Sequence, residues 1–410
     1  MSNHQIQNDQ REQQRLLVFE YSMAGEDQQG MVGISIEGLV MLVATIEDAL
    51  AGGFSPVVPL SDNLEGTQIS ADPRIEWKAV RDDDSLEDRL RELAEGTGIA
   101  FLIAPEINNH LARLTASVEA TGCTVLSQPS RVIKKASDKL GALAALGVTG
   151  ISVPETTTME QFLEDESIPL PAVVKPRYGA GCIGVFRVDT EVDVRAAIDA
   201  AAALGILRDE LIVQEFVPGK AMSLSAFGSG RRALVASINE QAIELGRPGE
   251  GSSYSGGSVG ANYDGLDEVC RTLADAVVEC FGLVGYFGVD FILNDDGDAS
   301  IIEVNARLTT AFAGMHRIAT GSYMAALADA ASGFERSLPR LDGCCAFRTG
   351  HSASVPGIDR IPGIKIKTAP LFQSIRLVDA AGNEHAFFSA KGASRSAAAA
   401  AVDRIRFTGQ

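Results

Sequence analysis

Two carboxylates and an amide are spaced so that they could bind a metal ion. Asp290 is followed thirteen residues later by Glu303 and then by Asn305. Glu303 and Asn305 are two apart on a predicted strand, so their side chains leave one face roughly 6–7 Å apart. A hairpin turn at 294–298 can place Asp290 beside them. Such oxygen ligands suit magnesium, which also keeps water and phosphate oxygens. The alternative is a salt bridge at the rim of the sheet, with Arg307 as the partner.

A glycine-rich segment could bind phosphate groups. Gly179, Gly181 and Gly184 match the pattern GxGxxG letter for letter. The dinucleotide-binding use of this pattern needs a helix that starts at the glycines, whereas residues 185–188 alternate as a strand does. We therefore interpret the segment as a hairpin loop whose N–H groups approach phosphates, with Lys175 supplying charge. The alternatives are a tight turn without a ligand and, for the whole chain, a nicotinamide-dependent dehydrogenase.

The elements that must position these residues alternate between apolar strands and amphipathic helices. This alternation predicts an α/β domain with a mostly parallel sheet in the first third of the chain. The predicted strands there are 16–19, 99–104 and 124–126, and the predicted helices are 36–50 and 108–120. Further strands are predicted at 172–175, 185–188, 211–217, 286–293 and 299–304.

Two local signals concern the middle of the chain. Ser137 is the predicted N-cap of a helix that stops at Gly147. The Gly/Ser/Pro-rich segment 246–260 is predicted to be a mobile loop, because such residues bury little surface and cost much entropy to fix.

Composition limits the class of protein. The 410 residues carry a formal net charge of -19 without a basic run, which disfavours nucleic acid and anionic membranes as partners. The polar residues 1–15 lack the apolar region of a signal peptide, so we expect a cytoplasmic protein with a disordered tail at 1–15. The six cysteines form no CxxC pair, which predicts reduced thiols rather than zinc ligands or disulfides.

Five ordered motifs resemble those of the ATP-grasp family. They are Ser137-Asp138-Lys139-Leu140, Val174-Lys175-Pro176 with its glycine loop, Gln214-Glu215-Phe216-Val217-Pro218-Gly219, Gly288-Val289-Asp290, and Glu303-Val304-Asn305-Ala306-Arg307. The resemblance covers about 105–333. It implies an α/β ATP-grasp fold, with an N-terminal parallel α/β domain and two α+β subdomains that grip ATP. We expect the N-terminal substrate domain at 16–130, the subdomain with the glycine-rich loop at 131–217, the subdomain with the metal site at 218–335 and a C-terminal appendage at 336–410.

The resemblance also implies roles for individual residues. Lys139 and Lys175 would contact the α- and β-phosphates under the glycine lid, and Arg307 with Lys175 would act in catalysis. Gln214, Glu215, Phe216 and Val217 would form the hinge that holds adenine, and Asp290, Glu303 and Asn305 would bind two Mg²⁺ ions, with Mn²⁺ as an alternative. Two departures matter: Ala221 stands where many members hold ribose with Glu, and Gly288 where some have Arg.

Within the family, four segments are most similar to tyramine–glutamate ligases, which act on the route to methanofuran: Phe19-Glu20-Tyr21, Glu37-Gly38, Ala104-Pro105-Glu106 and Asn305-Ala306-Arg307-Leu308-Thr309-Thr310. The similarity implies a carboxylate–amine ligase that works through an acyl phosphate and takes two small-molecule substrates. Glu20 or Glu37 would bind an ammonium group, and Thr309 and Thr310 the acyl end. Each carboxylate could instead be a helix cap or a surface charge. The alternative functions are another amino-acid ligase, similar to D-alanine ligases, and a non-catalytic ATP-binding module. A homodimer is compatible with the sequence, which leaves the oligomeric state open.

Overall fold

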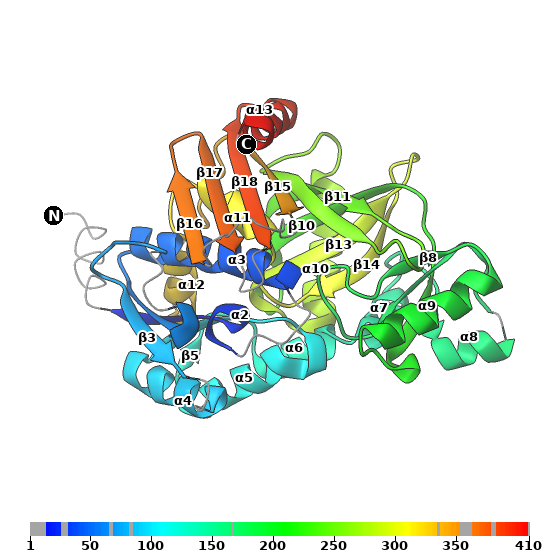
Figure 1. Cartoon of the computed structure of the whole chain (residues 1–410), viewed down its shortest axis with the longest axis horizontal. Helices are drawn as coiled ribbons and strands as arrows, with labels where there is room; N and C mark the ends of the chain where they lie inside the picture. The colour runs from blue at the N-terminus through cyan, green and yellow to red at the C-terminus, as the bar shows by residue number, and fades with distance from the viewer. Residues whose placement is uncertain are drawn as a thin grey trace, which may run out of the picture.

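The computed structural model describes residues 14–25, 32–64, 69–81, 85–165, 167–333, 337–352, 363–378 and 383–408. These residues form a parallel sheet, a small antiparallel sheet and a long antiparallel sheet, with helices packed against them (Figure 1). The predicted α/β fold class is confirmed. Most of the predicted tail at 1–15 lies outside the described residues, and Arg15 already begins the first strand.

The N-terminal sheet is parallel throughout, as predicted. Its order is β3-β2-β1-β4-β5, made of β1 (Arg15–Glu20), β2 (Ser55–Ser61), β3 (Glu76–Val80), β4 (Ile99–Ile103) and β5 (Thr124–Val125). Its helices are α2 (Tyr21–Ala24), α3 (Val32–Ala51), α4 (Leu86–Thr97), α5 (His110–Glu119) and α6 (Ser130–Ala136). Helices cover both faces of such a sheet, which explains why the central strands are continuous apolar runs. In β1, the side chains from Leu16 to Phe19 are fully buried.

The small sheet has the order β6-β9-β7-β8 and forms a lobe with a core of its own. Its strands are β6 (Thr156–Thr158), β7 (Ala172–Pro176), β8 (Phe186–Val188) and β9 (Leu211–Glu215), accompanied by α7 (Lys139–Val148), α8 (Met159–Asp165) and α9 (Glu191–Ala203). Because β7 and β8 pair antiparallel, the glycine-rich segment is a hairpin loop, as predicted, and no helix begins there. The predicted limits of α7 were wrong. Asp138, not Ser137, caps the helix by accepting from Gly141 N, and the helix passes Gly147 to end at Val148.

The long sheet has the order β14-β13-β10-β11-β12-β15-β18-β17-β16. The first part comprises β10 (Lys220–Ser229), β11 (Ala233–Glu244), β12 (Ser253–Gly260), β13 (Val284–Leu293) and β14 (Ala299–Asn305), with α10 (Asp267–Phe281), α11 (Ala311–Ile318) and α12 (Tyr323–Ala331). The prediction of a mobile loop at 246–260 was wrong for residues 253–260, because these residues form β12, which pairs with β11 on one side and β15 on the other. Ladder hydrogen bonds on both edges hold this glycine-rich strand in place.

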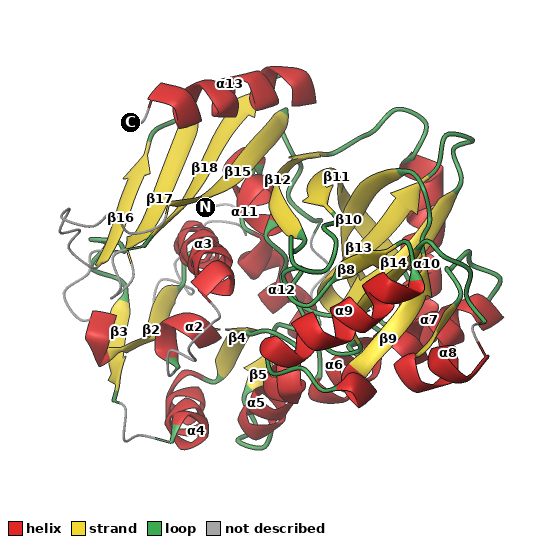
Figure 2. Cartoon of the chain, turned by 45° about the vertical axis from the view of Figure 1, so that its right-hand side comes forward, coloured by secondary structure: helices red, strands yellow, loops and turns green. Residues whose placement is uncertain are grey.

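The C-terminal strands continue the same sheet. They are β15 (Cys344–Ser352), β16 (Gly363–Thr368), β17 (Phe372–Val378) and β18 (Glu384–Gly392), and α13 (Arg395–Thr408) covers them on one face (Figure 1). Helix α3 lies on the other side, between β17 and β18 and the strands β1 and β2 of the parallel sheet (Figure 2). A helix that contacts two sheets must be apolar around most of its circumference. Leu39, Val40, Leu42 and Val43 in α3 are accordingly all buried. No helix in the described ranges is long and apolar enough to cross a membrane.

Candidate active site

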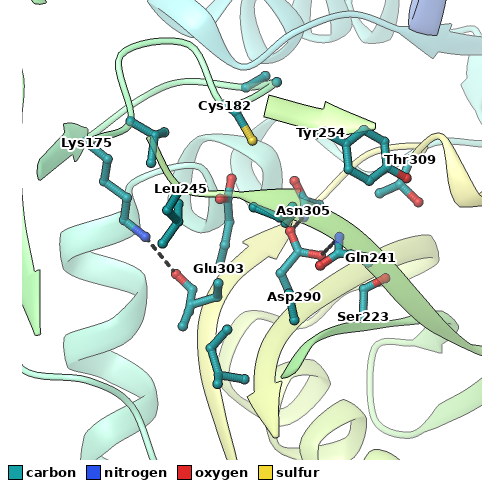
Figure 3. Close-up of a pocket in the computed structure, with 18 of the residues that line it drawn as sticks. Lys175, Cys182, Ser223, Gln241, Leu245, Tyr254, Asp290, Glu303, Asn305 and Thr309 are labelled. Atoms are coloured by element: carbon teal, nitrogen blue, oxygen red, sulfur yellow. Dashed lines mark hydrogen bonds between the residues drawn. The ribbon is translucent and has the colours of Figure 1, made fainter. Parts of the chain in front are cut away.

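A cavity of about 560 Å³ lies between the small sheet and the long sheet. Its walls come from β7, β8 and the glycine-rich loop on one side, and from β10, β11, β13 and β14 on the other (Figure 3). All but one of the predicted ATP and metal residues line it: Lys139, Lys175, Gly179, Gly181, Gln214, Glu215, Phe216, Val217, Asp290, Glu303 and Asn305. The exception is Gly184, which lies between the lining residues Ile183 and Val185. The fold therefore brings together five motifs that are distant in sequence.

Two lysines provide the positive charge at the phosphate end of the cavity. Lys139 Nζ lies 3.1 Å from Glu303 Oε1 and donates to Gly179 O at 2.9 Å. Lys175 Nζ donates to Gln214 Oε1 at 2.9 Å and to the carbonyl oxygen of Ile302 at 3.3 Å. Burial lowers the pKa of Lys175 to about 8, with Lys139 contributing, so this ammonium group is still mainly charged at neutral pH.

The glycine-rich loop has a backbone that favours glycine. Gly181, Cys182 and Gly184 have φ values of 68°, 62° and 70°. At Gly184 a Cβ atom would lie 2.6 Å from Ile206 Cδ1, so this position excludes larger residues sterically as well. The Cys182 side chain points into the cavity (Figure 3). The loop thus contains three left-handed residues within four positions, a tight turn that only small residues adopt readily.

The predicted metal ligands lie on adjacent strands. Asp290 pairs with Glu303 across β13 and β14, and Asn305 Nδ2 donates to Asp290 Oδ2 at 2.9 Å. Burial and the neighbouring Glu303 raise the pKa of Asp290 to about 7. Burial alone would also raise the pKa of Glu303, but Lys139 and Lys175 hold it below its ordinary value. Asp290 and Glu303 therefore lie close enough for their negative charges to repel each other when both are ionised.

The donor set of this region fits a magnesium ion. Gln241 Nε2 donates to Asp290 Oδ1 at 3.1 Å, while Gln241 Oε1 is buried without a hydrogen-bond partner (Figure 3). Among the described residues, no three His, Cys, Asp or Glu side chains are placed to hold a metal ion together, so two carboxylates and amide oxygens are what the cavity offers. Hard oxygen ligands in this small number leave coordination positions for phosphate oxygens, as magnesium sites commonly do.

Arg307 lines the cavity and is largely shielded from solvent, with 13% of its side chain exposed. Its Nε donates to Glu106 Oε2 at 3.1 Å, Nη1 to the carbonyl oxygen of Leu308 at 3.0 Å and Nη2 to Asn305 Oδ1 at 3.3 Å. The alternative of a salt bridge at the sheet rim does not describe this arrangement, because the carboxylate partner is Glu106, which is 2% exposed, and the Arg307 side chain is only 13% exposed.

The end of the cavity opposite Lys175, which we call the far end, is lined by all of the predicted substrate residues except one (Figure 3). Glu37, Thr309 and Thr310 line it, and Thr310 Oγ1 donates to Glu37 Oε2 at 2.9 Å. Burial raises the pKa of Glu37 above its ordinary value. Glu20 does not line the cavity: it is the cap of α2 and accepts from Met23 N at 2.9 Å. The helix-cap alternative therefore describes Glu20.

Sequence reasoning missed the polar floor of the cavity, which we define as Ser223, Asn239 and Gln241. Ser223 lies on β10 and the other two on β11, and Asn239 Nδ2 donates to Ser223 Oγ at 3.2 Å. All three line the cavity. The sequence pattern that could have predicted these residues is a polar side chain at every second position of a strand, because such side chains lie on one face of the sheet.

The aromatic residues Tyr254 and Phe347 line the same far end, 6.5 Å apart between ring centroids. Gly288 also lines it, and a Cβ there would meet Thr309 Cγ2 at 2.8 Å. A larger residue at position 288 would therefore require the Thr309 side chain to shift. Thr309 fills that volume and bonds through Oγ1 to Tyr286 Oη at 2.6 Å.

A cavity that joins paired lysines, a glycine-rich hairpin and buried oxygen ligands defines a nucleotide-binding enzyme. Two family models match the chain in succession: a pre ATP-grasp 3 domain over residues 58–133 and an ATP-grasp domain over 136–311. Together they span more than half of the chain, which therefore belongs to the ATP-grasp superfamily. Enzymes of this superfamily use ATP and Mg²⁺.

Relatives agree with this assignment. The chain is 28% identical over 305 residues to tyramine–L-glutamate ligase of Methanocaldococcus fervens, covering 73% of this chain and 89% of that enzyme. It is 29% identical over 166 residues to D-alanine–D-alanine ligase of Francisella tularensis subsp. holarctica, covering 37% of this chain and 51% of that enzyme. The crystal structure of an ATP-grasp superfamily protein from Archaeoglobus fulgidus matches with a TM-score of 0.59 at 26% identity, covering 85% and 96% of the two chains. The predicted similarity to tyramine–glutamate ligases is confirmed.

Proposed function

We propose that this chain is an ADP-forming ligase that joins L-glutamate, through its γ-carboxylate, to a small aromatic amine such as tyramine. One observation carries the proposal. The same cavity holds a phosphate end with Lys139 and Lys175, and a far end with a partly buried carboxylate, Glu37, beside the rings of Tyr254 and Phe347. A carboxylate and apolar rings together suit an aromatic ammonium compound.

The reaction has two bond-forming steps. A carboxylate oxygen attacks the γ-phosphorus of ATP, the bond to the bridging oxygen breaks and ADP leaves. The amine nitrogen then attacks the acyl carbon, loses a proton, and inorganic phosphate leaves. The protein does little covalent work in such a reaction, so its contribution is alignment and electrostatic stabilisation.

The residues of the cavity divide these tasks. Lys139 and Lys175 hold phosphate oxygens below the glycine-rich loop, and residues 214–217 hold the adenine. Asp290, Glu303 and Asn305 would hold two Mg²⁺ ions, which supply charge neutralisation at the phosphates. Arg307 keeps two N–H groups free for the transferring phosphoryl group or the acyl phosphate, because three of its five are bonded to protein.

The charges at the far end favour an amine without a carboxylate of its own. The cations that line the cavity are Lys139, Lys175, Arg187 and Arg307. The first two belong to the phosphate end, and Arg187 stacks on Phe216 with its guanidinium carbon 4.5 Å from the ring centroid. In this proposal Arg307 stabilises the acyl phosphate, so it is not available to bind a second carboxylate. A nucleophile such as D-alanine, whose carboxylate needs a further cation, finds none where Gly288 replaces arginine and Thr309 fills the space.

A matched pair of amines tests this proposal. The purified chain is incubated with ATP, Mg²⁺, L-glutamate and either tyramine or tyrosine, which differ only in the carboxylate. ADP is measured and the product mass is determined. We expect a γ-glutamyl amide with tyramine and at least tenfold less product with tyrosine. Equal use of both amines would contradict the argument from charge, and ADP formation only with two amino acids would favour the D-alanine ligase alternative.

A further inference from the structure

Arg307 is held by a carboxylate that reaches it from the other domain of the molecule, and we infer that this residue, Glu106, is a positioning residue for Arg307. Glu106 keeps the guanidinium turned toward the transferring phosphoryl group and away from the carboxylates of the cavity. The inference rests on the proposed function, since it concerns the residue that stabilises the acyl phosphate.

Glu106 connects three segments that are distant in sequence. It follows β4, at the carboxyl edge of the parallel sheet, and is 2% exposed. Its Oε2 accepts from Arg307 Nε at 3.1 Å, and its Oε1 lies 3.3 Å from the donor Ser137 Oγ. Ser137 stands two residues before Lys139, and Arg307 two residues after Asn305. One buried side chain thus contacts the neighbours of both the phosphate and the metal residues.

The arrangement fixes the plane of the guanidinium. Glu106 takes its Nε–H, the carbonyl oxygen of Leu308 takes one N–H of Nη1, and Asn305 Oδ1 takes one of Nη2. Glu106 does not line the cavity, whereas Arg307 does. Glu106 therefore acts through Arg307 and does not touch the reacting groups.

Charge explains why a partner outside the cavity matters. Glu303 and Glu37 also attract Arg307, and both line the cavity. If Glu106 were neutral, these two carboxylates and Asp290, which also interacts with Arg307, would be the nearest anionic groups, and the guanidinium would turn toward them. It would then occupy the space of the phosphoryl group and compete with the metal for Glu303.

The test compares substitutions that separate charge from shape. Glu106→Gln keeps an acceptor oxygen but removes the charge, and Glu106→Asp keeps the charge on a shorter side chain. We expect Glu106→Gln to lower kcat at least tenfold with the KM for ATP changed less than twofold, and Glu106→Asp to recover part of the loss. Arg307→Lys and the double variant complete a cycle, in which we expect the second substitution to cost much less than it does alone.

A binding measurement makes the result independent of turnover. Acetyl phosphate, which carries the acyl phosphate group, is titrated into the protein with Mg²⁺ and ADP. We expect Glu106→Gln to weaken acetyl phosphate binding about tenfold while ADP binding stays the same. If the wild type shows no ligase activity with any amine, the proposed function fails, whereas the titration still decides the role of Glu106.

Glu119→Gln is the matched control. Glu119 also accepts from a serine in the same domain, at 2.5 Å from Ser130 Oγ, and joins α5 to α6 away from the cavity. We expect a lower melting temperature but unchanged kcat and acetyl phosphate binding. Wild-type kcat and binding in Glu106→Gln, or full additivity with Arg307→Lys, would overturn the inference. If Glu106→Gln does not fold, Glu106→Asp in the same titration decides: acetyl phosphate binding weaker than wild type with unchanged ADP binding sustains the inference, and wild-type affinity for both ligands from a carboxylate one methylene shorter overturns it.

Discussion

Glu20 should make this protein less stable as the pH rises, and replacing it with glutamine should remove that dependence. Its carboxylate is 2% exposed at the end of β1, where Oε2 accepts from Ser22 Oγ at 2.7 Å and Met23 N at 2.9 Å. Burial raises its pKa from 4.5 to about 7 despite these hydrogen bonds. The neutral form is therefore the one that the fold prefers.

The sign and size of the effect follow from linkage. A pKa raised on folding contributes stability that is complete below the unfolded-state value, near 4.5, and is lost as the pH rises through the folded value, near 7. A difference of about 2.5 pH units corresponds to about 3 kcal/mol in the free energy of unfolding between pH 4.5 and pH 8. Glutamine cannot ionise but offers an acceptor oxygen to the same donors.

Urea unfolding at several pH values measures this quantity. Trp77, the single tryptophan, lies on β3 in the same parallel sheet as Glu20, so its fluorescence reports the relevant domain. We expect the stability of Glu20→Gln relative to wild type to grow by about 3 kcal/mol from pH 4.5 to pH 8. Other titrating groups cancel in this difference. A constant difference across that range would refute the reasoning, and a raised KM for the amine in Glu20→Gln would restore Glu20 as a substrate residue.

Three further predictions concern the cavity. Glu303→Gln should lower Mg²⁺-dependent ADP formation at least a hundredfold without unfolding the protein, which circular dichroism and an ADP assay would show; near wild-type turnover at limiting Mg²⁺ would contradict the metal assignment. Lys175→Ala should raise the KM for ATP and lower kcat, because it removes a phosphate contact that tightens during transfer; unchanged ATP kinetics would contradict it. Mg²⁺ affinity should increase roughly tenfold from pH 6 to pH 8, because Asp290, with its pKa raised to about 7, must lose a proton to bind metal; calorimetry of Asp290→Asn should show no such increase.

The parts of the site that the sequence predicts best are those set by local geometry. The hairpin between β13 and β14 is encoded by its turn residues, and alternation then puts Glu303 and Asn305 on the same face. Likewise, the strand pattern after Gly184 distinguishes a glycine-rich hairpin loop from the start of a dinucleotide-binding helix. Both predictions needed only neighbours along the chain.

The parts of the fold and site that the sequence predicts poorly depend on contacts with residues far away in the chain. The glycine-rich residues of β12 become a strand because β11 and β15 flank them, and β15 begins more than eighty residues later. In sequence, Glu106 belongs to a segment that resembles tyramine–glutamate ligases, but no local pattern predicts its contact with Arg307, which spans 201 residues. Glu20 offered two interpretations that no local pattern separates, and its burial against α2 and α3 decides between them: a Cβ at Gly38 would lie 2.4 Å from its Oε1.

The way in which the cavity's cations are bonded explains how an acidic protein can keep a polyanion site folded before ATP arrives. Lys139 is paired with Glu303, Lys175 with neutral acceptors, and Arg307 with Glu106, so none of these buried cations lacks a partner. Binding of ATP and a metal ion would then replace existing ion pairs with new ones. Phosphate groups would pair with Lys139, and Glu303 would become available to a metal ion. Arg307 keeps Glu106 through this exchange, because Glu106 lies outside the cavity and has no competing ligand there. Glu303, which lines the cavity, would thus change its partner when ligands bind, whereas Glu106, which does not line the cavity, would keep Arg307.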